Sequence, residues 1–459
     1  MNKNSIQSLK EKYKKDYNRV LNNVNESINL NNENDEEDKI MDQKLIVISE
    51  ALKENPKIKR IRVNYNQIGA QSIKHFTQSL KKNSSIDEIN FSSCYINREG
   101  IKFLSESLNA ISRLTRLDLH CSEIGAEGMK HLSHSLNLNS SLHTLVVSRN
   151  ELEDEGIKYL SESLKLNFSL KFVDISENEI GPIGMKSLSE SLKQNSSLQT
   201  LLVYCNDLGD EGTKYLSESL KLNFSLKFID ISENKIGPIG MKDLSDSLMI
   251  NSSLQEIVLS TNNATSKGAK FISEALRINN SLKSIDFQSN SLGSKGLKYL
   301  SDSLKLNCTL KKINICNNKI ITFPSQILID IFQRNHSLVQ FKHDIKYTAK
   351  DLSLIDILVD YNNDWSSEQH PKCLSKIFRN VVFVFVCCLR QIERDSHFKV
   401  PKFVLFEIFK MIDRKSFFEF DCKQVIEEKG EQENMKNGNN KKKKLSKNNK
   451  KKNLKKKKK

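Results

Sequence analysis

The feature that most constrains this chain is an apolar residue that returns every 28 residues along most of its length. This opening position is held by Ile58, Ile86, Leu114, Leu142, Leu170, Leu198, Leu226, Leu254, Leu282, Leu310 and Leu338. A short repeated unit cannot bury its own apolar face, so neighbouring units must stack into one continuous core. The period therefore predicts a solenoid.

Each unit begins with the pattern of a strand. After Leu170, apolar residues follow at Val173 and Ile175, with the alternation of a β-strand. Asn stands eight places after the opening residue at Asn66, Asn150, Asn178, Asn206, Asn234, Asn262, Asn290 and Asn318, and Cys94 and Ser122 replace it in the second and third units. Its side-chain amide can satisfy backbone groups in the bend that follows the strand.

The second half of each unit has the pattern of a helix. Gly recurs fourteen places after the opening residue, as at Gly184, and we expect it at the helix entry. Leu188 and Leu192, four residues apart, then share one helix face. Asn195 and its equivalents are expected to end the helix, because Asn tolerates the left-handed conformation that closes one. We interpret the N-x-S/T sequons that these Asn residues create as helix stops rather than as glycosylation sites.

These strand and helix patterns resemble the leucine-rich repeats of the ribonuclease-inhibitor type. The resemblance rests on Leu170-x-x-Val173-x-Ile175-x-x-Asn178-x-Ile180, on its relatives in the other units, and on the helix phrase that begins at Gly184, and it covers about residues 40–346. It implies an α/β horseshoe with a concave parallel sheet and convex helices. Members of that family, which include inhibitors, innate-sensor tails and Ran GTPase-activating proteins, act mostly by binding a protein on the concave face or its rims.

The rest of the chain differs in composition from the repeats. The expected parts are a disordered charged and Asn-rich N-terminus at 1–39, a helical N-cap at 40–57, about ten or eleven repeats at 58–346, a C-cap helix at 347–364, a helical module at 365–425 and a disordered Lys-rich tail at 426–459. Within the module, the segment 365–420 faintly resembles an F-box or SOCS box, and it could equally be a small bundle that caps the last repeat.

The net charge is concentrated in the C-terminal tail, and cysteine usage points to a reducing compartment. The formal net charge is +16, yet residues 441–459 hold 13 lysines and no acid, which leaves +3 for the remainder. The nine cysteines are an odd number without metal-ligand spacing. We see no secretory signal, and the longest apolar run, Val381 to Leu389, is too short to span a bilayer. We expect a cytoplasmic or nuclear protein.

No pattern in the sequence indicates a catalytic centre, a metal site or a cofactor. The loops that begin at Gly181 and Gly237 lack the third Gly and the Lys of a phosphate-binding loop. His131 and His134 lie three apart on a helix, where a solvated pair is more plausible than two metal ligands. His120 beside Cys121 lacks an orienting third group for nucleophilic catalysis.

Three functions remain open on the sequence. The first is a non-catalytic scaffold or adaptor that binds a protein partner on the concave face. The second is regulation of a small GTPase, as in the Ran GTPase-activating relatives. Those relatives typically end in an acidic stretch, whereas this chain ends in lysines. The third is a ubiquitin-ligase substrate receptor, which would act through residues 365–420.

The concave face supplies the candidate binding residues. Strand positions that point to this face or its edge carry acids, aromatics and aliphatics in the middle units, and we select Phe172, Asp174, Glu177, Leu202, Tyr204, Phe228, Asp230, Glu233 and Glu256. Asp118, Asp174, Asp230 and Asp286 recur on every second strand, and we expect neither Asp174 nor Asp230 to belong to the core. The partner should present Lys or Arg beside an apolar side chain.

The C-terminal lysines form a second candidate site, for anions. The densest runs are Lys441, Lys442, Lys443, Lys444, Lys455, Lys456, Lys457, Lys458 and Lys459. Such a run stays unfolded by self-repulsion and attracts nucleic acid or acidic surfaces without sequence preference. It could also act as a nuclear signal, or serve only to keep the chain in solution.

Deleting residues 440–459 should abolish salt-sensitive retention of the full chain on heparin or RNA, since this segment supplies most of the net charge. Elution from a heparin column over a salt gradient measures this. Retention that is unchanged at low salt after the deletion would contradict the expectation.

Overall fold

The computed structural model describes residues 3–23, 25–30, 38–83, 85–320, 325–335 and 337–344. The chain separates into two units, Met1–Asp364 and Trp365–Lys459, and every described residue belongs to the first. The C-cap helix expected at 347–364, the module at 365–425 and the Lys-rich tail lie outside the described residues.

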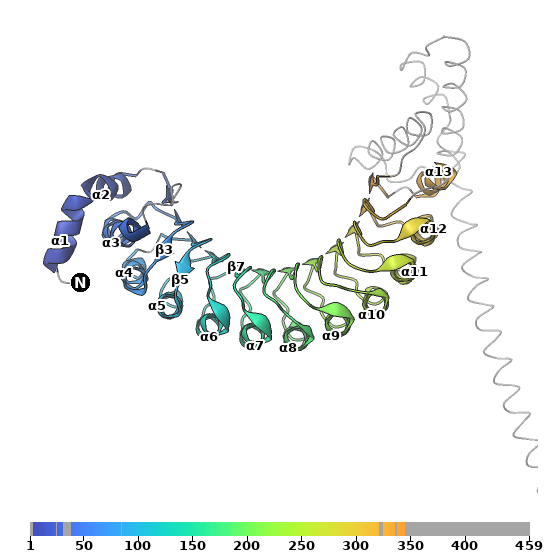
Figure 1. Cartoon of the computed structure of the whole chain (residues 1–459), viewed down its shortest axis with the longest axis horizontal. Helices are drawn as coiled ribbons and strands as arrows, with labels where there is room; N and C mark the ends of the chain where they lie inside the picture. Colours follow the sequence, from blue (N-terminus) through green and yellow to red (C-terminus); the bar gives the residue numbers. More distant parts are fainter. Residues whose placement is uncertain are drawn as a thin grey trace, which may run out of the picture. The chain divides into compact units, whose positions relative to one another are not determined.

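Strands and helices alternate along the described chain (Figure 1). The helices are α1 (Lys3–Lys12), α2 (Lys14–Leu21), α3 (Asp38–Glu54), α4 (Ala70–Leu80), α5 (Arg98–Leu108), α6 (Gly125–Leu136), α7 (Glu153–Leu164), α8 (Pro182–Leu192), α9 (Gly209–Leu220), α10 (Pro238–Leu248), α11 (Thr265–Leu276), α12 (Gly293–Leu304) and α13 (Ser325–Arg334). The strands are β1 (Ser27–Asn29), β2 (Arg60–Arg62), β3 (Gln67–Ile68), β4 (Glu88–Asn90), β5 (Tyr95–Ile96), β6 (Arg116–Asp118), β7 (Thr144–Val146), β8 (Phe172–Asp174), β9 (Thr200–Leu202), β10 (Phe228–Asp230), β11 (Glu256–Val258), β12 (Ser284–Asp286), β13 (Lys312–Asn314) and β14 (Gln340–Lys342). None of these helices is long and apolar enough to cross a membrane.

Most of the strands form one parallel sheet that follows the repeat, and β3 and β5 pair in a separate two-stranded sheet. Strands β1, β2, β4 and β6 to β14 make a 12-stranded sheet, and each pairs with the corresponding strand of the next unit. The register advances by one repeat at each step, so Val173 pairs with Leu201 and Leu201 pairs with Ile229. In Figure 1 the strands line the inner side of an arc and the helices its outer side. The predicted leucine-rich-repeat solenoid is confirmed.

The core lies between the sheet and the row of helices. Leu170, Val173 and Ile175 from the strand side and Leu188 from the helix side are each 0% exposed. Gly184 sits in the first turn of α8, where an added Cβ would lie 2.6 Å from an Asp154 carboxylate oxygen of the preceding unit. A side chain at this position would therefore push neighbouring units apart.

Asn residues after the strands form a ladder that crosses the units. Asn178 is 0% exposed, and its Nδ2 donates to the carbonyls of Val147 (3.0 Å) and Ser176 (2.9 Å). Its Oδ1 accepts from the backbone N–H groups of Asn150 (2.8 Å) and Leu152 (3.3 Å). The predicted role of this Asn is confirmed, because one amide satisfies four buried backbone groups in two units.

A second Asn ladder runs at the other end of the units, and here the sequence expectation was wrong. No described Asn that follows a helix has the expected left-handed conformation. Asn167, 2% exposed, instead donates to the carbonyls of Leu136 (2.8 Å) and Asn139 (3.0 Å) and accepts from the N–H groups of Ser169 and Leu170. Buried carbonyls at the end of the preceding helix need a donor, and an Asn that bridges two units supplies it.

Some helix N-termini are capped by the preceding unit. The carboxylate of Asp154 accepts from the N–H groups of Gly181 and Gly184, both at 2.8 Å, and Asp210 plays the same part for α10. A carboxylate is favourable at a helix N-terminus, where unpaired N–H groups gather. These glycine-bearing loops, which the sequence analysis rejects as phosphate sites, therefore bind a carboxylate of the protein itself through their backbone N–H groups.

The expectation of disorder over residues 1–39 is wrong for the part that the structure describes. Helices α1 and α2 and strand β1 form there, and Tyr13 (9% exposed), Val20 (1%) and Ile28 (3%) are buried. Strand β1 pairs with β2, which would otherwise present an open edge, and Asn55 of the N-cap donates to the Val20 carbonyl at 2.8 Å. Few apolar residues are needed here, because they only have to cover the N-terminal end of the solenoid that the repeats form.

Replacing Asn178 with Ala should destabilise the solenoid by about 2–4 kcal/mol, since it leaves four buried backbone groups without partners. Urea unfolding followed by circular dichroism measures the change. Asn263→Ala, at an exposed position of the groove described below, is the control and should leave the midpoint unchanged. Equal midpoints for the Asn178→Ala variant and the parent would contradict the proposed role of the ladder.

Candidate binding surface on the concave face and its rim

The centre of the concave sheet carries acids and aliphatic residues on alternate strands. The residues involved stand four places after the opening residue of each unit, and the pairing of the strands places them side by side. In order, this concave row is Asp118, Val146, Asp174, Leu202, Asp230, Val258 and Asp286. The acids are thus separated by one strand, and an apolar side chain stands between each pair.

A second row, two places earlier on the same strands, holds the aromatic candidates. Phe172 pairs with Thr200, Thr200 with Phe228, and Phe228 with Glu256. Both phenylalanines are half-buried and Glu256 is exposed. The structure therefore places the selected aromatic residues directly beside the selected acids on β8 and β10.

The acids of the concave row are more buried than the sequence suggested. Asp174 is 8% exposed and accepts from the N–H of Ser176 at 3.0 Å. Asp230 is partly buried and accepts from the N–H of Ser232 at 2.9 Å and from the Ser232 hydroxyl. The expectation that these carboxylates stand clear of the interior is wrong, because each also holds the backbone two residues further on.

The centre of the row is a negative region in a partly desolvated environment. Burial raises the pKa of Asp230, and Asp286 and Asp174 add repulsion that the hydrogen bonds from Ser232 oppose. Burial likewise raises the pKa of Tyr204 to about 12, with further contributions from Asp174, Glu177 and Asp230. No Lys or Arg among the described residues forms an ion pair with Asp174 or Asp230. A cation from outside would therefore be favoured at this point.

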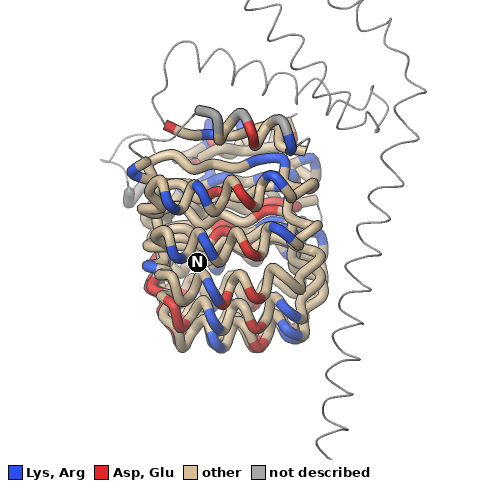
Figure 2. Tube along the Cα trace, turned by 90° about the vertical axis from the view of Figure 1, so that its right-hand side faces the viewer, with Lys and Arg blue, Asp and Glu red and all other residues tan. Residues whose placement is uncertain are grey.

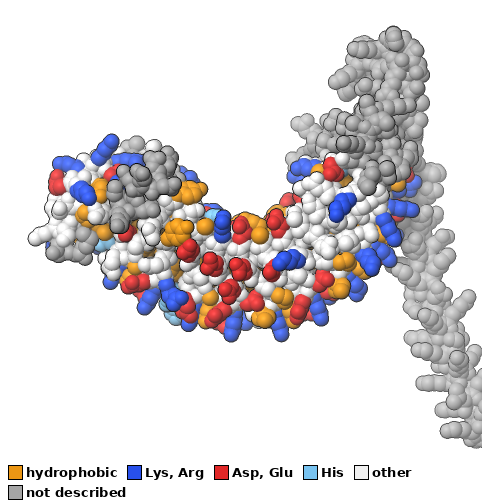
Figure 3. Space-filling view, in the orientation of Figure 1, with side chains coloured by type: hydrophobic (Ala, Val, Ile, Leu, Met, Phe, Trp, Pro, Cys, Tyr) orange, Lys and Arg blue, Asp and Glu red, His pale blue; other side chains and the backbone are white. Residues whose placement is uncertain are grey.

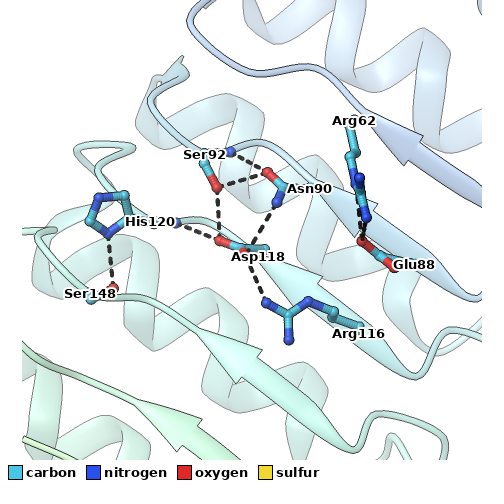
Figure 4. A network of polar contacts seen from close by, with 8 residues as sticks. All are labelled: Arg62, Glu88, Asn90, Ser92, Arg116, Asp118, His120 and Ser148. Carbon is cyan, nitrogen blue, oxygen red and sulfur yellow. Dashed lines mark hydrogen bonds and ion pairs between the residues drawn. The ribbon is translucent and has the colours of Figure 1, made fainter. Parts of the chain in front are cut away.

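The N-terminal end of the concave row is different, because its acid is already neutralised. Figure 4 shows Asp118 at the centre of a polar network. Its carboxylate contacts Arg116 Nη2 (3.0 Å), Asn90 Nδ2 (3.2 Å), the Ser92 hydroxyl (2.9 Å) and the His120 N–H (3.2 Å). Asp174, Asp230 and Asp286, further along the concave row, form no ion pair with a described Lys or Arg.

The histidines that the sequence singled out have ordinary surroundings. The His120 ring bonds to the Ser148 hydroxyl on the next strand at 2.9 Å rather than to Cys121 (Figure 4). His131 is half-buried and His134 is exposed on convex helix α6. The described residues hold no cluster of three or more potential metal ligands.

An acidic groove runs along the rim where the strands lead into the helices. It has a volume of about 1060 Å³, and its charged lining residues are Glu123, Arg149, Glu151, Glu177, Glu179, Asp207, Glu233 and Lys235. Six are acids and two are bases, and Lys235 is paired with Asp207. Figure 3 shows Asp and Glu side chains gathered on this side of the solenoid. Glu177 and Glu233 join this rim groove to the concave row.

Several of these rim acids occupy an unfavourable backbone conformation. Glu177, Glu179 and Glu233 have φ values of 54°, 56° and 52°. A left-handed conformation costs a residue other than Gly roughly 1–2 kcal/mol, and Asn or Gly would adopt it more easily. Cys121, Arg149 and Lys235 adopt the same conformation at the same repeat positions, so the left-handed turn is a feature of the repeat rather than of the acids.

The repeats match a known family. A family model described as Leucine Rich repeat matches residues 113–133, 138–161, 166–189, 194–217, 222–245 and 279–301. These six stretches of the chain are therefore leucine-rich repeats. No curated protein sequence matches it.

Two solved structures resemble parts of this leucine-rich-repeat protein. One is the Leiomodin-1 Actin-Binding Site 2 (ABS2), with 18% identity and a TM-score of 0.29, over 38% of this chain and 87% of that one. The other is the Caenorhabditis elegans tropomodulin C-terminal domain, with 20% identity and a TM-score of 0.29, over 34% and 92% of the two chains. At such TM-scores the similarity carries no property of those proteins to this one.

Sequence reasoning found two acids of the rim groove, Glu177 and Glu233, and missed the others. The signal was present: acids stand nine places after the opening residue in four successive units, at Glu123, Glu151, Glu179 and Asp207. The alternation of side chains along a strand does not predict where a side chain points after the bend that ends the strand. These acids could therefore not be assigned to a surface from the sequence. The left-handed turn that aims them became visible only in the structure.

Replacing Asp230 with Asn should leave the leucine-rich-repeat protein as stable as the parent, or more stable, at neutral pH. The amide oxygen can still accept from Ser232, and the change removes a buried charge with a raised pKa. Above the raised pKa the charged form costs stability, and below it the parent carboxyl is itself neutral. The advantage of the variant should therefore disappear as the pH falls through the folded-state pKa.

Thermal melts of parent and variant at neutral and acid pH check this. Glu162→Gln, on the exposed side of α7, is the control and should change neither melt. A variant that is clearly less stable than the parent at neutral pH would show that the Asp230 charge is stabilising instead.

Proposed function

We propose that this leucine-rich-repeat protein binds a partner protein on the middle of its concave face, and that it acts by binding rather than by catalysis. Leucine-rich repeats commonly serve as protein-interaction scaffolds, and this chain has the structure of a leucine-rich-repeat solenoid. The observation that carries the proposal is the pair Asp174 and Asp230, which form no ion pair with a described Lys or Arg and lie beside half-buried apolar and aromatic side chains.

The chemistry of the surface defines the partner. The carboxylates of Asp174 and Asp230 lie on the two strands that flank the strand of Leu202. They therefore favour a partner that presents Lys or Arg on both sides of an apolar side chain. Phe172, Phe228 and Tyr204 supply large apolar area that a partner can cover. The rim groove continues the negative surface, so a partner with a longer basic segment would contact both.

The cost of burying the Asp230 charge supports the proposal that this surface binds a cationic partner. Strand spacing places Asp174 and Asp230 about 10 Å apart, where two charges repel by only ~0.4 kcal/mol in water and more in a drier site. Burial of the Asp230 charge is the main cause of its raised pKa, and repulsion from Asp286 and Asp174 adds to that cost. A cationic partner would relieve it, and binding should therefore weaken at acid pH, where the carboxyl becomes neutral.

Replacing both Asp174 and Asp230 with Asn should weaken partner binding by about tenfold or more, ~1.4 kcal/mol, with the fold intact. Asn keeps the acceptor oxygen for the N–H groups of Ser176 and Ser232, whereas Lys at either position would remove it. Partners are captured by cross-linking to the parent, and their affinities are then measured by titration calorimetry.

The control removes the same number of charges from the convex side. Glu162→Gln with Glu190→Gln, on exposed positions of α7 and α8, should bind as the parent does. Equal affinity of the parent and the Asp174→Asn, Asp230→Asn variant would rule out the concave row as the site. The rim groove would then be tested by Glu177→Lys with Glu233→Lys.

A further inference from the structure

The edge of the solenoid opposite the rim groove has a different character. It is formed by the loops that join helices α6 to α12 to the strands that follow them, at residues 137–143, 165–171, 193–199, 221–227, 249–255, 277–283 and 305–311. We call these loops the basic edge. Each is held from inside by a buried Asn of the second ladder, such as Asn167 or Asn223.

Large apolar side chains project from the basic edge into solvent. The residue before the ladder Asn is apolar in six of the seven loops, and two loops add a Phe directly after it. The exposed fractions are 70% for Leu138, 62% for Leu166, 59% for Phe168, 59% for Leu222, 57% for Phe224, 58% for Ile250, 62% for Ile278 and 56% for Leu306. Single exposed apolar residues are common, but a row at one repeat position marks an interaction surface.

The charges on the basic edge all have the same sign. The seven loops contain the bases Lys165, Lys171, Lys193, Lys221, Lys227, Arg277, Lys283, Lys305 and Lys311, and no Asp or Glu. Lys193 and Lys305 pair with acids on neighbouring helices. The remaining bases stand beside the exposed apolar side chains, so the edge combines positive charge with apolar area.

The solenoid arranges these side chains in an extended row. Leu138 and Leu306 are separated by six repeats, which spans at least about 29 Å at the usual spacing of parallel strands. Figure 2 shows the units stacked behind one another without marked sideways drift, so the loops of one edge stay close to a common plane.

We propose that the basic edge docks on the surface of an anionic lipid bilayer. Leu, Ile and Phe side chains insert between the headgroups, and the flanking Lys and Arg side chains reach the lipid phosphates and carboxylates. The absence of acids from these loops removes the repulsion that such a surface would otherwise exert.

The repeat favours a bilayer over an acidic protein as the occupant. A protein would have to match six apolar contacts along a rigid row that Gln194 interrupts, whereas a fluid bilayer accommodates any spacing. Docking by this edge leaves the concave sheet uncovered, because the edge lies at the ends of the strands. A partner bound on the concave row would then be held beside the membrane.

The test is co-sedimentation of the full chain with vesicles of phosphatidylcholine alone or mixed with phosphatidylserine. The edge variant carries Leu222→Asp and Phe224→Asp. The matched control carries Ile183→Asp and Ile239→Asp, whose side chains are 72% and 68% exposed at the start of α8 and α10, at the other end of the helices. Both variants add two negative charges, and the C-terminal lysines are present in all three proteins.

The parent and the control should sediment with the anionic vesicles, with partition coefficients within about twofold of each other, and the edge variant should lose about tenfold or more. Matching melting temperatures confirm that the exposed substitutions leave the fold intact. Equal losses in both variants, no loss in either, or no binding of the parent would overturn the proposal. Loss of a captured acidic protein by the edge variant, with vesicle binding retained, would also overturn it and assign the edge to that protein.

Discussion

The hydrogen bonds that Asn side chains make between neighbouring units are the constraint on which the rest of this structure depends. A solenoid turns its backbone twice in each unit, and both turns are buried against the next unit, where water cannot satisfy their polar groups. One ladder, with Asn178 as an example, closes the turn after the strand, and the other, with Asn167, closes the turn after the helix. Asn178 both donates and accepts across the unit boundary and Asn167 donates across it, so the ladders also fix the spacing of the units.

Because the ladders fix the register, residues at one repeat position become a row on the surface. The concave row alternates acids with aliphatic residues, the rim groove collects acids, and the basic edge collects lysines and apolar side chains. These rows lie on the sheet and at its two ends, so one rigid body presents surfaces of different chemistry that do not compete for the same residues. Binding on the concave row and binding on the basic edge can occur together.

The sequence predicted the architecture well, because the repeat reports the core directly: Leu170, Val173 and Ile175 are buried as their spacing requires. It failed where a residue acts across units or against an end of the solenoid. Asn167 was read as a local helix stop, although its hydrogen bonds reach the preceding unit. Residues 3–30 were read as disordered on composition, yet Val20 and Ile28 only needed the exposed end of the N-cap and of β2 to become buried. The strands hold the candidate residues in the register that the repeat predicts, but the burial of Asp174 and the left-handed conformation of Glu179 depend on backbone geometry that periodicity does not encode.

The central claim is that the concave row and the basic edge are separate binding surfaces. Hydroxyl-radical footprinting of the full chain, with and without its cross-linked partner, tests it directly, since each surface carries its own aromatic residues. Bound partner should reduce oxidation of Phe172, Tyr204 and Phe228 and leave Phe168 and Phe224 as reactive as in the free chain. Protection of Phe168 and Phe224 by the partner, with the concave aromatics unchanged, would contradict the account.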